Sequence, residues 1–271
     1  MSFPVYLPVG PLRVHPHFLF EALAYGVGFR LYVELRKTRG DFLDTPRRWW
    51  VVAAAATGAL FGALLLAMLE DPARLASEWH EPRTLLAGKT IVGALIGGLL
   101  AVEWTKRRLG IKQRTGDLFA IPLCVGIAIG RIGCFLTGLA DGTCGSASSL
   151  PWAVDFGDGV RRHPTQLYEV IFLALLAVAL ARLWRRPYLR GDLFKLFMVA
   201  YFSFRLAIDF LKPDPRVLLG TSSIQWACVA MLIYYRADIV RWVQRGGLAY
   251  ERIETEEGYQ VLEREPARGD R

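Results

Sequence analysis

The chain has 271 residues and a mass of 30.4 kDa, and 53% of its residues are hydrophobic. A mean hydropathy of +0.29 excludes a disordered chain and is high for a soluble domain of this length. The chain carries 33 Lys and Arg residues against 25 Asp and Glu residues, a formal charge of +8. With so much apolar sequence, this charge favours a membrane protein and not a nucleic-acid-binding protein.

The predicted elements are long apolar segments, and segment 49–69 is the clearest. It has no charged side chain, and at about 1.5 Å per residue it matches a bilayer core of roughly 30 Å. The predicted spans, in chain order, are 16–34, 49–69, 88–104, 117–136, 166–184, 192–211 and 222–240. The expected fold is an all-α membrane protein with seven transmembrane helices, because a soluble protein would have too little chain left to cover so many apolar helices.

The number of Lys and Arg residues alternates between high and low in successive loops that join these spans. They concentrate after the first, third and fifth spans and are fewer in the other loops. The positive-inside rule therefore predicts an N-terminus outside and a C-terminus in the cytoplasm. We expect one transmembrane domain over residues 1–244 and a polar cytoplasmic tail over 245–271, which need not be ordered.

Neither the cysteines nor the histidines suggest a metal centre. Cys124, Cys134, Cys144 and Cys228 lack zinc-site spacing and are expected to be small buried residues. A disulfide between Cys134 and Cys144 on the outer face is an alternative. We find no nucleotide-binding or hydrolase motif, and we predict neither a metal nor a cofactor.

Glycines four residues apart occur in three of the predicted spans, at 58 and 62, 93 and 97, and 126 and 130. Small residues at this spacing let helix backbones approach closely. Helix packing is therefore the preferred interpretation for most of them.

Ionisable residues inside the predicted spans are the strongest functional signal, because each costs at least about 2.5–3.5 kcal/mol at the centre of a helix unless it is paired or hydrated. Arg131 lies near the outer end of 117–136, and Glu169 lies at the outer entry of 166–184. Tyr201, Arg205 and Asp209 follow one side of the helix predicted over 192–211. The first span also contains an acidic residue, Glu21.

Arg131 and Arg205 would suit the phosphate of a lipid headgroup, since a guanidinium group stays charged and binds phosphate oxygens in a bidentate manner. The alternative is that they pair with Asp209 and Glu169 and merely lock helices together. The glycines around Arg131 favour a ligand site, because they let a backbone pass close to a ligand. They are residues 130, 133, 138 and 142.

Three sequence blocks together resemble the bacterial prolipoprotein diacylglyceryl transferase family. They are GRIG at 130–133, RHPTQLYE at 162–169 and YFSFRLAIDFLKPD at 201–214, of which HPTQLYE is highly specific. The resemblance implies a seven-span enzyme of the bacterial inner (cytoplasmic) membrane. It implies transfer of the diacylglyceryl group of phosphatidylglycerol, or of a related anionic phospholipid, to the lipobox cysteine of a preprolipoprotein signal peptide. A thioether forms and glycerol phosphate is released.

The resemblance also implies roles for particular residues. Arg131 and Arg205 match two essential arginines, Tyr201 matches a functional tyrosine, Asp209 stands where the family usually has Glu, and Gly142 matches a glycine of the outer loop. The arginines would hold the phosphate and stabilise the leaving group, with Asp209 orienting Arg205 and Tyr201 donating a hydrogen bond.

The remaining motif residues are expected near the substrate. Gly130 and Gly133 belong to GRIG, and His163, Gln166 and Glu169 belong to HPTQLYE, which we expect to shape the outer entrance. His163 is a candidate general base, although a histidine before proline at a helix start is more often a packing or capping residue.

The chain departs from the family pattern at several positions. Cys134 replaces an Asn, Thr137 and Leu139 replace an Asn and a Glu, and Val92 and Ala94 occupy the stretch where the family has a His ahead of a Gly pair. That His is the usual candidate for the base that a thiol needs.

Glu21 is the predicted replacement for the missing base, because a carboxyl group in apolar surroundings can accept a proton near neutral pH. Neutralisation of Arg131 or Arg205 is the alternative role of Glu21. Two functions therefore remain open: an active transferase, or a non-catalytic paralogue that binds an anionic phospholipid or a lipoprotein partner.

Overall fold

The computed structural model describes residues 3–39, 43–78, 80, 88–217, 219–247, 253–255 and 258–260, and it is mostly helical. The helices are α1 (Pro16–Arg39), α2 (Thr45–Glu70), α3 (Pro72–Glu78), α5 (Ile91–Arg108), α6 (Asp117–Thr137), α7 (Thr165–Trp184), α8 (Asp192–Ile208), α9 (Ser223–Tyr234) and α10 (Arg236–Gln244). Short 3-10 helices, η1 (Gly138–Asp141) and η2 (Asp209–Leu211), extend α6 and α8.

Three antiparallel hairpins complete the described elements. They pair β1 (Leu7–Val9) with β2 (Leu12–Val14), β3 (Val154–Asp155) with β4 (Arg161–Arg162), and β5 (Ile253–Thr255) with β6 (Gly258–Gln260). The last hairpin belongs to the predicted tail. Of residues 245–271, only 245–247 and these two strands are described, so the prediction for the rest of the tail lies outside the described residues.

Local sequence explains where several helices begin. The Thr90 side chain accepts a hydrogen bond from the backbone of Gly93, so α5 begins at Ile91 and not at residue 88. Ser222 and Gln225 form a reciprocal capping box at the start of α9. The predicted span 222–240 is not one continuous helix, because the chain turns at Tyr235 between α9 and α10.

The helices α2 and α5 pack backbone against backbone. A Cβ atom added to Gly62 would lie 2.2 Å from the carbonyl oxygen of Gly93, and one added to Gly97 would lie 2.2 Å from that of Gly58. The prediction that these glycines serve helix packing is therefore confirmed.

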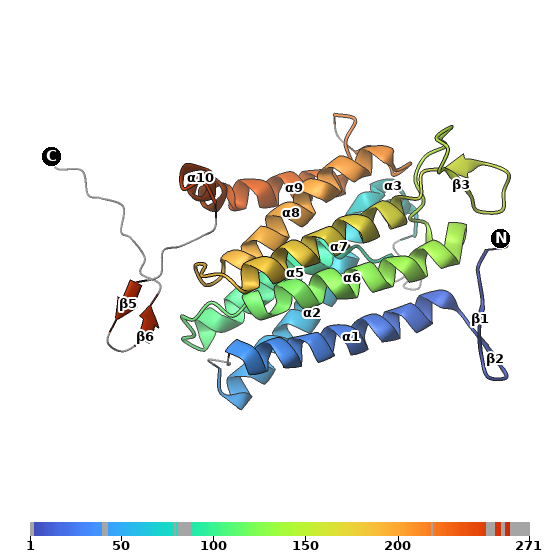
Figure 1. Cartoon of the computed structure of the whole chain (residues 1–271). Helices are drawn as coiled ribbons and strands as arrows, with labels where there is room; N and C mark the ends of the chain where they lie inside the picture. The colour runs from blue at the N-terminus through green and yellow to red at the C-terminus, as the bar shows by residue number, and fades with distance from the viewer. Residues whose placement is uncertain are drawn as a thin grey trace.

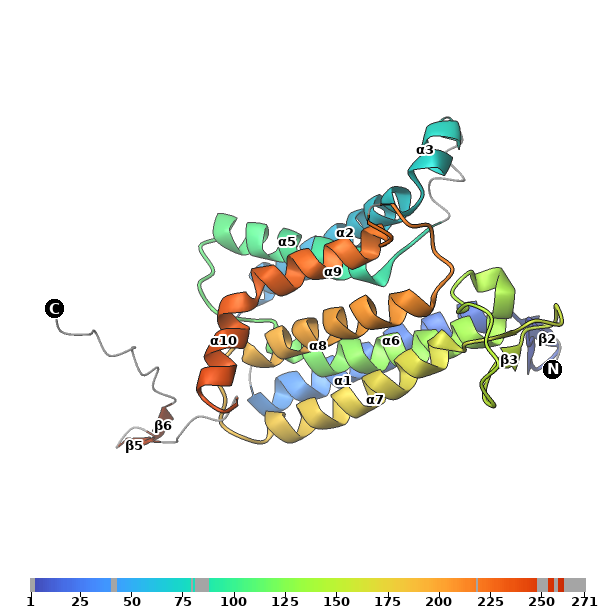
Figure 2. The ribbon, with the colours of Figure 1, turned by 90° about the horizontal axis from the view of Figure 1, so that it is seen from above.

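The long helices lie side by side in a bundle (Figure 1). α1 packs on α6, which also contacts α7 and α8, while α9 contacts α2, α5 and α8. The main hydrophobic core is formed by side chains of α5 to α9, among them Phe197, Phe202 and Leu173. Figure 2 shows α2, α5 and α9 on one side of the bundle and α1, α6, α7 and α8 on the other.

By length and composition, three helices in the described chain can cross a membrane: residues 45–70, residues 117–141 including η1, and residues 165–184. α9 is a shorter apolar helix. Large apolar side chains such as Phe61, Leu65 and Leu175 are exposed on the outside of the bundle. The hairpin β1–β2 and the helix α10 lie at opposite ends of the bundle (Figure 1).

Candidate functional site

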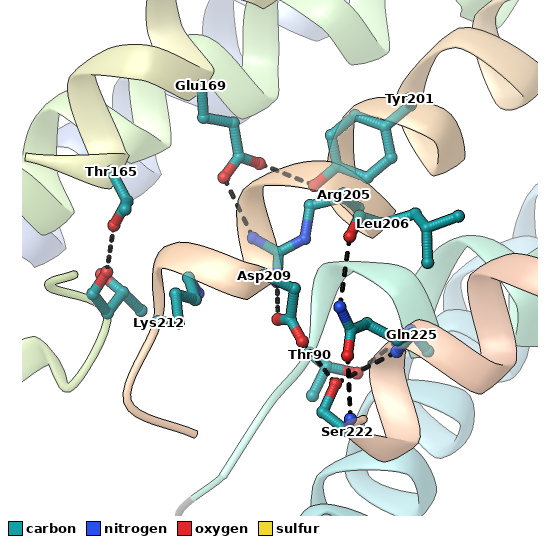
Figure 3. Close-up of polar contacts among 12 residues, drawn as sticks. Thr90, Thr165, Glu169, Tyr201, Arg205, Leu206, Asp209, Lys212, Ser222 and Gln225 are labelled. Carbon is teal, nitrogen blue, oxygen red and sulfur yellow. Dashed lines mark hydrogen bonds and ion pairs between the residues drawn. The ribbon is translucent and has the colours of Figure 1, made fainter. Parts of the chain in front are cut away.

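A buried carboxylate, Glu169 on α7, lies at the centre of a polar region inside the bundle (Figure 3). Its Oε1 accepts a hydrogen bond from the Tyr201 hydroxyl at 2.6 Å. Its Oε2 lies 2.9 Å from Nε of Arg131 and 3.4 Å from Nη1 of Arg205. Three helices, α6, α7 and α8, thus each contribute to one ionic cluster, which we call the Glu169 cluster.

A second carboxylate, Asp209 in η2, extends the cluster toward α9. Its Oδ1 lies 3.7 Å from Nη2 of Arg205, and its Oδ2 accepts a hydrogen bond from the Ser222 hydroxyl. Ser222 in turn caps α9 together with Gln225 (Figure 3). The start of α9 is therefore joined to the end of α8 through buried polar contacts.

The two arginines of the cluster each have an N–H donor that makes no hydrogen bond to the described residues. Arg131 Nε faces Glu169 without the alignment of a hydrogen bond, and its Nη1 approaches the sulfur of Cys134 at 3.9 Å. Within the described residues, Nε of Arg131 and Nε of Arg205 are buried without a hydrogen-bond partner. Buried donors of this kind favour binding of an acceptor-rich anion, because an unpaired polar group is costly inside a protein.

The structure brings together five predicted site residues: Arg131, Glu169, Tyr201, Arg205 and Asp209. It also contains the ion pairs that we considered as the alternative to a ligand site, because the arginines face Glu169 and Asp209. Glu169 is only 2% exposed. The expectation that it shapes the outer entrance is therefore wrong, since it lies inside the bundle.

Gln166 and His163 lie apart from these ion pairs. Gln166 is buried rather than at an entrance, and its Nε2 donates to the Cys144 sulfur at 3.3 Å. His163 is half-buried, with its Nδ1 3.2 Å from the Tyr168 hydroxyl. Together with Trp152 and Leu211 it lines an apolar pocket of about 630 Å³.

Glu21 does not join the Glu169 cluster. Its side chain on α1 is half exposed and faces Tyr25 at 3.5 Å and His17 at 4.0 Å. The carboxylates that face Arg131 and Arg205 are Glu169 and Asp209. The pairing of Glu21 with either arginine, which was the alternative to its predicted role as the base, is therefore absent from the contacts of the described residues.

The glycines near Arg131 serve different purposes. A Cβ atom on Gly133 would lie 2.7 Å from Phe20 Cβ, so Gly133 packs α6 against α1 and does not make room for a ligand. Gly130 has open space where a Cβ would stand. Gly142 adopts a φ of +68°, which explains the preference for glycine at that position.

Sequence reasoning missed Lys212, Ser222 and Gln225. Lys212 directly follows η2 and is buried beside the cluster, and burial lowers its pKa to about 8, with repulsion from Arg205 and Arg131 adding to the effect. Its position in the KPD sequence after the sixth predicted span was the available signal. The cysteine alternative was wrong too, because Cys134 and Cys144 are free thiols.

Comparison with known proteins adds an independent finding. The family profile described as prolipoprotein diacylglyceryl transferase matches residues 4–240. A relative from Pseudomonas aeruginosa (strain UCBPP-PA14), named phosphatidylglycerol–prolipoprotein diacylglyceryl transferase, is 32% identical over 89% of this chain and 94% of its own length. Relatives with the same name from Glaesserella parasuis and Methylococcus capsulatus are 30% and 32% identical over 86% and 85% of this chain, and 93% and 89% of their own lengths.

Proposed function

This chain belongs to the prolipoprotein diacylglyceryl transferase family, and from that premise we infer that it is an enzyme that transfers diacylglyceryl from phosphatidylglycerol to the thiol of a lipobox cysteine. The names of its relatives support this function over that of a non-catalytic paralogue. In the reaction a carbon–sulfur bond forms at the glyceryl carbon, the bond from that carbon to the phosphate oxygen breaks, and glycerol phosphate leaves.

The observation that carries the proposal for the site is that Arg131 and Arg205 share the single carboxylate of Glu169, while neither Nε atom makes a hydrogen bond to the described residues. Two guanidinium groups from different helices can contact different oxygens of one phosphodiester. They would hold the headgroup and stabilise the negative charge that grows on the leaving phosphate. Because this charge is larger in the transition state than in the bound lipid, the same contacts would accelerate the reaction.

The other members of the Glu169 cluster would keep these arginines in position. Glu169 faces both guanidinium groups and would hold them until the phosphate arrives. Asp209 would orient Arg205 from the opposite side. Tyr201 donates to Glu169 in the structure and could turn its hydroxyl toward the substrate.

We further propose a seven-span protein of the bacterial inner membrane, with residues 1–244 as the membrane domain. The alternation of Lys and Arg between the loops supports an N-terminus outside and a C-terminus in the cytoplasm. The placement of β1–β2 and α10 at opposite ends of the bundle agrees with an odd number of crossings (Figure 1).

A mass measurement tests the activity. Purified protein, phosphatidylglycerol and a synthetic lipobox peptide should give a peptide heavier by one diacylglyceryl group. Arg131→Ala and Arg205→Ala should each lose transfer by about 100-fold or more, as removal of one transition-state contact does elsewhere. Arg205→Lys should also be poor, because lysine keeps the charge but loses the planar fork.

Arg30→Ala is the matched control, since Arg30 is an exposed arginine of α1 paired with Glu34 and should be dispensable. Phospholipid binding by the unmodified chain without any peptide product would contradict the transferase function and favour the lipid-binding alternative. Full activity of Arg131→Ala would show that the arginines do not hold the phosphate.

A further inference from the structure

The described structure places a histidine, a carboxylate and a thiol together at the C-terminal end of α6. His17 is the second residue of α1, Asp141 ends η1, and Cys134 lies in the last turn of α6. Nδ1 of His17 is 3.1 Å from Oδ1 of Asp141. One imidazole nitrogen of His17, the sulfur of Cys134 and one carboxylate oxygen of Asp141 all lie within 4.8 Å of one another.

The geometry of the His17–Asp141 pair is that of an oriented imidazole. A carboxylate next to Nδ1 stabilises the neutral tautomer that carries its proton on Nδ1, and this leaves the lone pair on Nε2. Asp141 is itself held, because its Oδ2 accepts a hydrogen bond from Thr143, and its side chain is only 6% exposed. The His17 side chain is 46% exposed, so a substrate can reach the ring.

This pair lies next to the arginine side of the Glu169 cluster. Cys134 is the link, because its sulfur belongs to the His17 group and also lies 3.9 Å from Nη1 of Arg131. Among the described residues, the charged and titratable groups facing His17 are Asp141 from η1, Cys134 from α6 and Glu21 from its own helix, the last at 4.0 Å from Nε2.

The proposed reaction needs a group that removes the proton of the acceptor thiol, because the thiolate is the nucleophile. Glu169 already faces two arginines and a tyrosine, and the Nδ1 of His163 faces the Tyr168 hydroxyl beside an apolar pocket. His17 instead combines an oriented ring with a half-exposed side chain, and Cys134 lies between it and Arg131.

We propose that His17 is the general base of this enzyme and that Asp141 is its positioning residue. This inference rests on the proposed function. The thiol proton of the lipobox cysteine passes to Nε2 of His17 while the sulfur forms its bond to the glyceryl carbon of the lipid. The carbon–oxygen bond to the phosphate breaks, the electron pair leaves with glycerol phosphate held by the arginines, and the imidazolium then returns its proton to solvent.

The test uses full-length protein and saturating phosphatidylglycerol, with lipidated lipobox peptide as the product. His17→Asn should lower kcat at neutral pH by about 100-fold or more, the usual contribution of a general base. His15→Asn is the matched control, because His15 lies on the same segment, with its ring against Tyr6, and should retain kcat. Asp141→Asn should lower kcat in the same direction.

Two readouts separate a base from a structural residue. An unperturbed cysteine thiol has a pKa of about 8.5, so at pH 9 the acceptor ionises without help and the ratio of unmodified to His17→Asn activity should shrink. Added imidazole should restore part of the activity of His17→Ala. A ratio that stays constant with pH, or no rescue by imidazole, would overturn the assignment.

Two experiments, the variant Cys134→Ser and treatment with a chelator, distinguish a general base from a metal site formed by His17, Cys134 and Asp141. A base requires Cys134→Ser to keep its activity and EDTA to have no effect. Loss of activity in both experiments would overturn the proposal in favour of a metal site. Phosphatidylglycerol binding should remain intact in His17→Asn, and failure of the unmodified chain to lipidate the peptide would instead refute the proposed function.

Discussion

Glu169 has more charged and polar neighbours than its single negative charge can neutralise. One of its oxygens accepts a hydrogen bond from Tyr201, and the other pairs with Arg131 and Arg205; these three residues come from two other helices. When one partner of a buried ion pair is lost, the charge that remains is uncompensated, and the cost is about 3–5 kcal/mol. The stability of the bundle and the affinity for an anion should therefore respond in opposite directions to a change at Glu169.

Glu169→Gln is the corresponding prediction. The amide can still accept a hydrogen bond from Tyr201, but both guanidinium groups lose their shared anion, so stability should fall by about 3–5 kcal/mol. Phosphatidylglycerol affinity should rise, because a competing negative charge is gone. Unfolding and lipid binding in detergent measure the two effects, with the exposed Glu34→Gln as the control expected to change little.

The buried Lys212 should make the free energy of unfolding depend on pH. Its pKa is lowered to about 8 by burial, from an ordinary value of 10.5. Between these values the unfolded chain keeps a proton that the native chain has lost, so the contribution of Lys212 to stability rises with pH across this window. Below pH 8 both states are protonated and the destabilisation is complete.

Lys212→Met should therefore be more stable than the unmodified chain below pH 8, and the difference should decrease toward pH 10.5. Unfolding temperatures of both proteins at several pH values measure this difference. A difference that does not change with pH would show that Lys212 acts only through packing.

The members of the Glu169 cluster were predictable from sequence because charge inside an apolar span is costly and therefore informative. The burial of Glu169 inside the bundle could not be predicted, since a residue in the first turns of a helix can point to an entrance or into the core. The His17–Asp141 pair was missed because 123 positions separate its members, and neither lies deep within a predicted span.

The pair α2 and α5 depends on four glycines whose backbones nearly touch. Gly97→Ala would place a methyl group 2.2 Å from the Gly58 carbonyl oxygen, and because the obstacle is backbone, the helices must separate. We expect a loss of about 1–3 kcal/mol, seen as a lower unfolding temperature.

Gly26→Ala is the matched control, because Gly26 lies in α1 and an added Cβ would meet nothing within 4 Å. It should be neutral or slightly stabilising, since alanine is the better helix former. Equal losses in both variants would indicate that helix propensity and not close packing governs α2 and α5.

The helices themselves were largely predictable, but their ends were not always so. Apolar content alone placed the last span over 222–240, whereas the helix stops at Tyr234 and turns into α10. A run of hydropathy does not detect a turn made by ordinary residues. Thr90, by contrast, is a standard capping residue that could have set the start of α5.

The bundle as a whole makes a prediction about sidedness. In bacterial cells expressing the chain, Arg13→Cys on β2 should react with a membrane-impermeant maleimide in intact spheroplasts. Gln244→Cys at the end of α10 should react only after permeabilisation. The four native cysteines are buried and should contribute little background. Labelling of both positions from the same side would contradict the proposed odd number of crossings.

Hydropathy and loop charge predicted the sequence of apolar helices, yet they could not predict how each helix is rotated about its axis. Glu21 illustrates this limit. It was predicted to act as the base beside the arginines or, alternatively, to neutralise one of them, but α1 packs on α6 through another face, where Phe20 lies against Gly133. Rotation depends on side chains from distant segments, which a single sequence does not reveal.

The order of the cluster along the chain has a consequence for synthesis, which supplies helices from the N-terminus onward. The close α2–α5 pair is complete once residue 108 has been made, before any part of the Glu169 cluster exists. Arg131 is then synthesised with α6, before its counter-ion Glu169 in α7. Arg205 and Asp209 are synthesised later, with α8 and η2. A nascent chain arrested between α6 and α7 would thus carry an unneutralised arginine, which makes this interval the vulnerable stage of insertion.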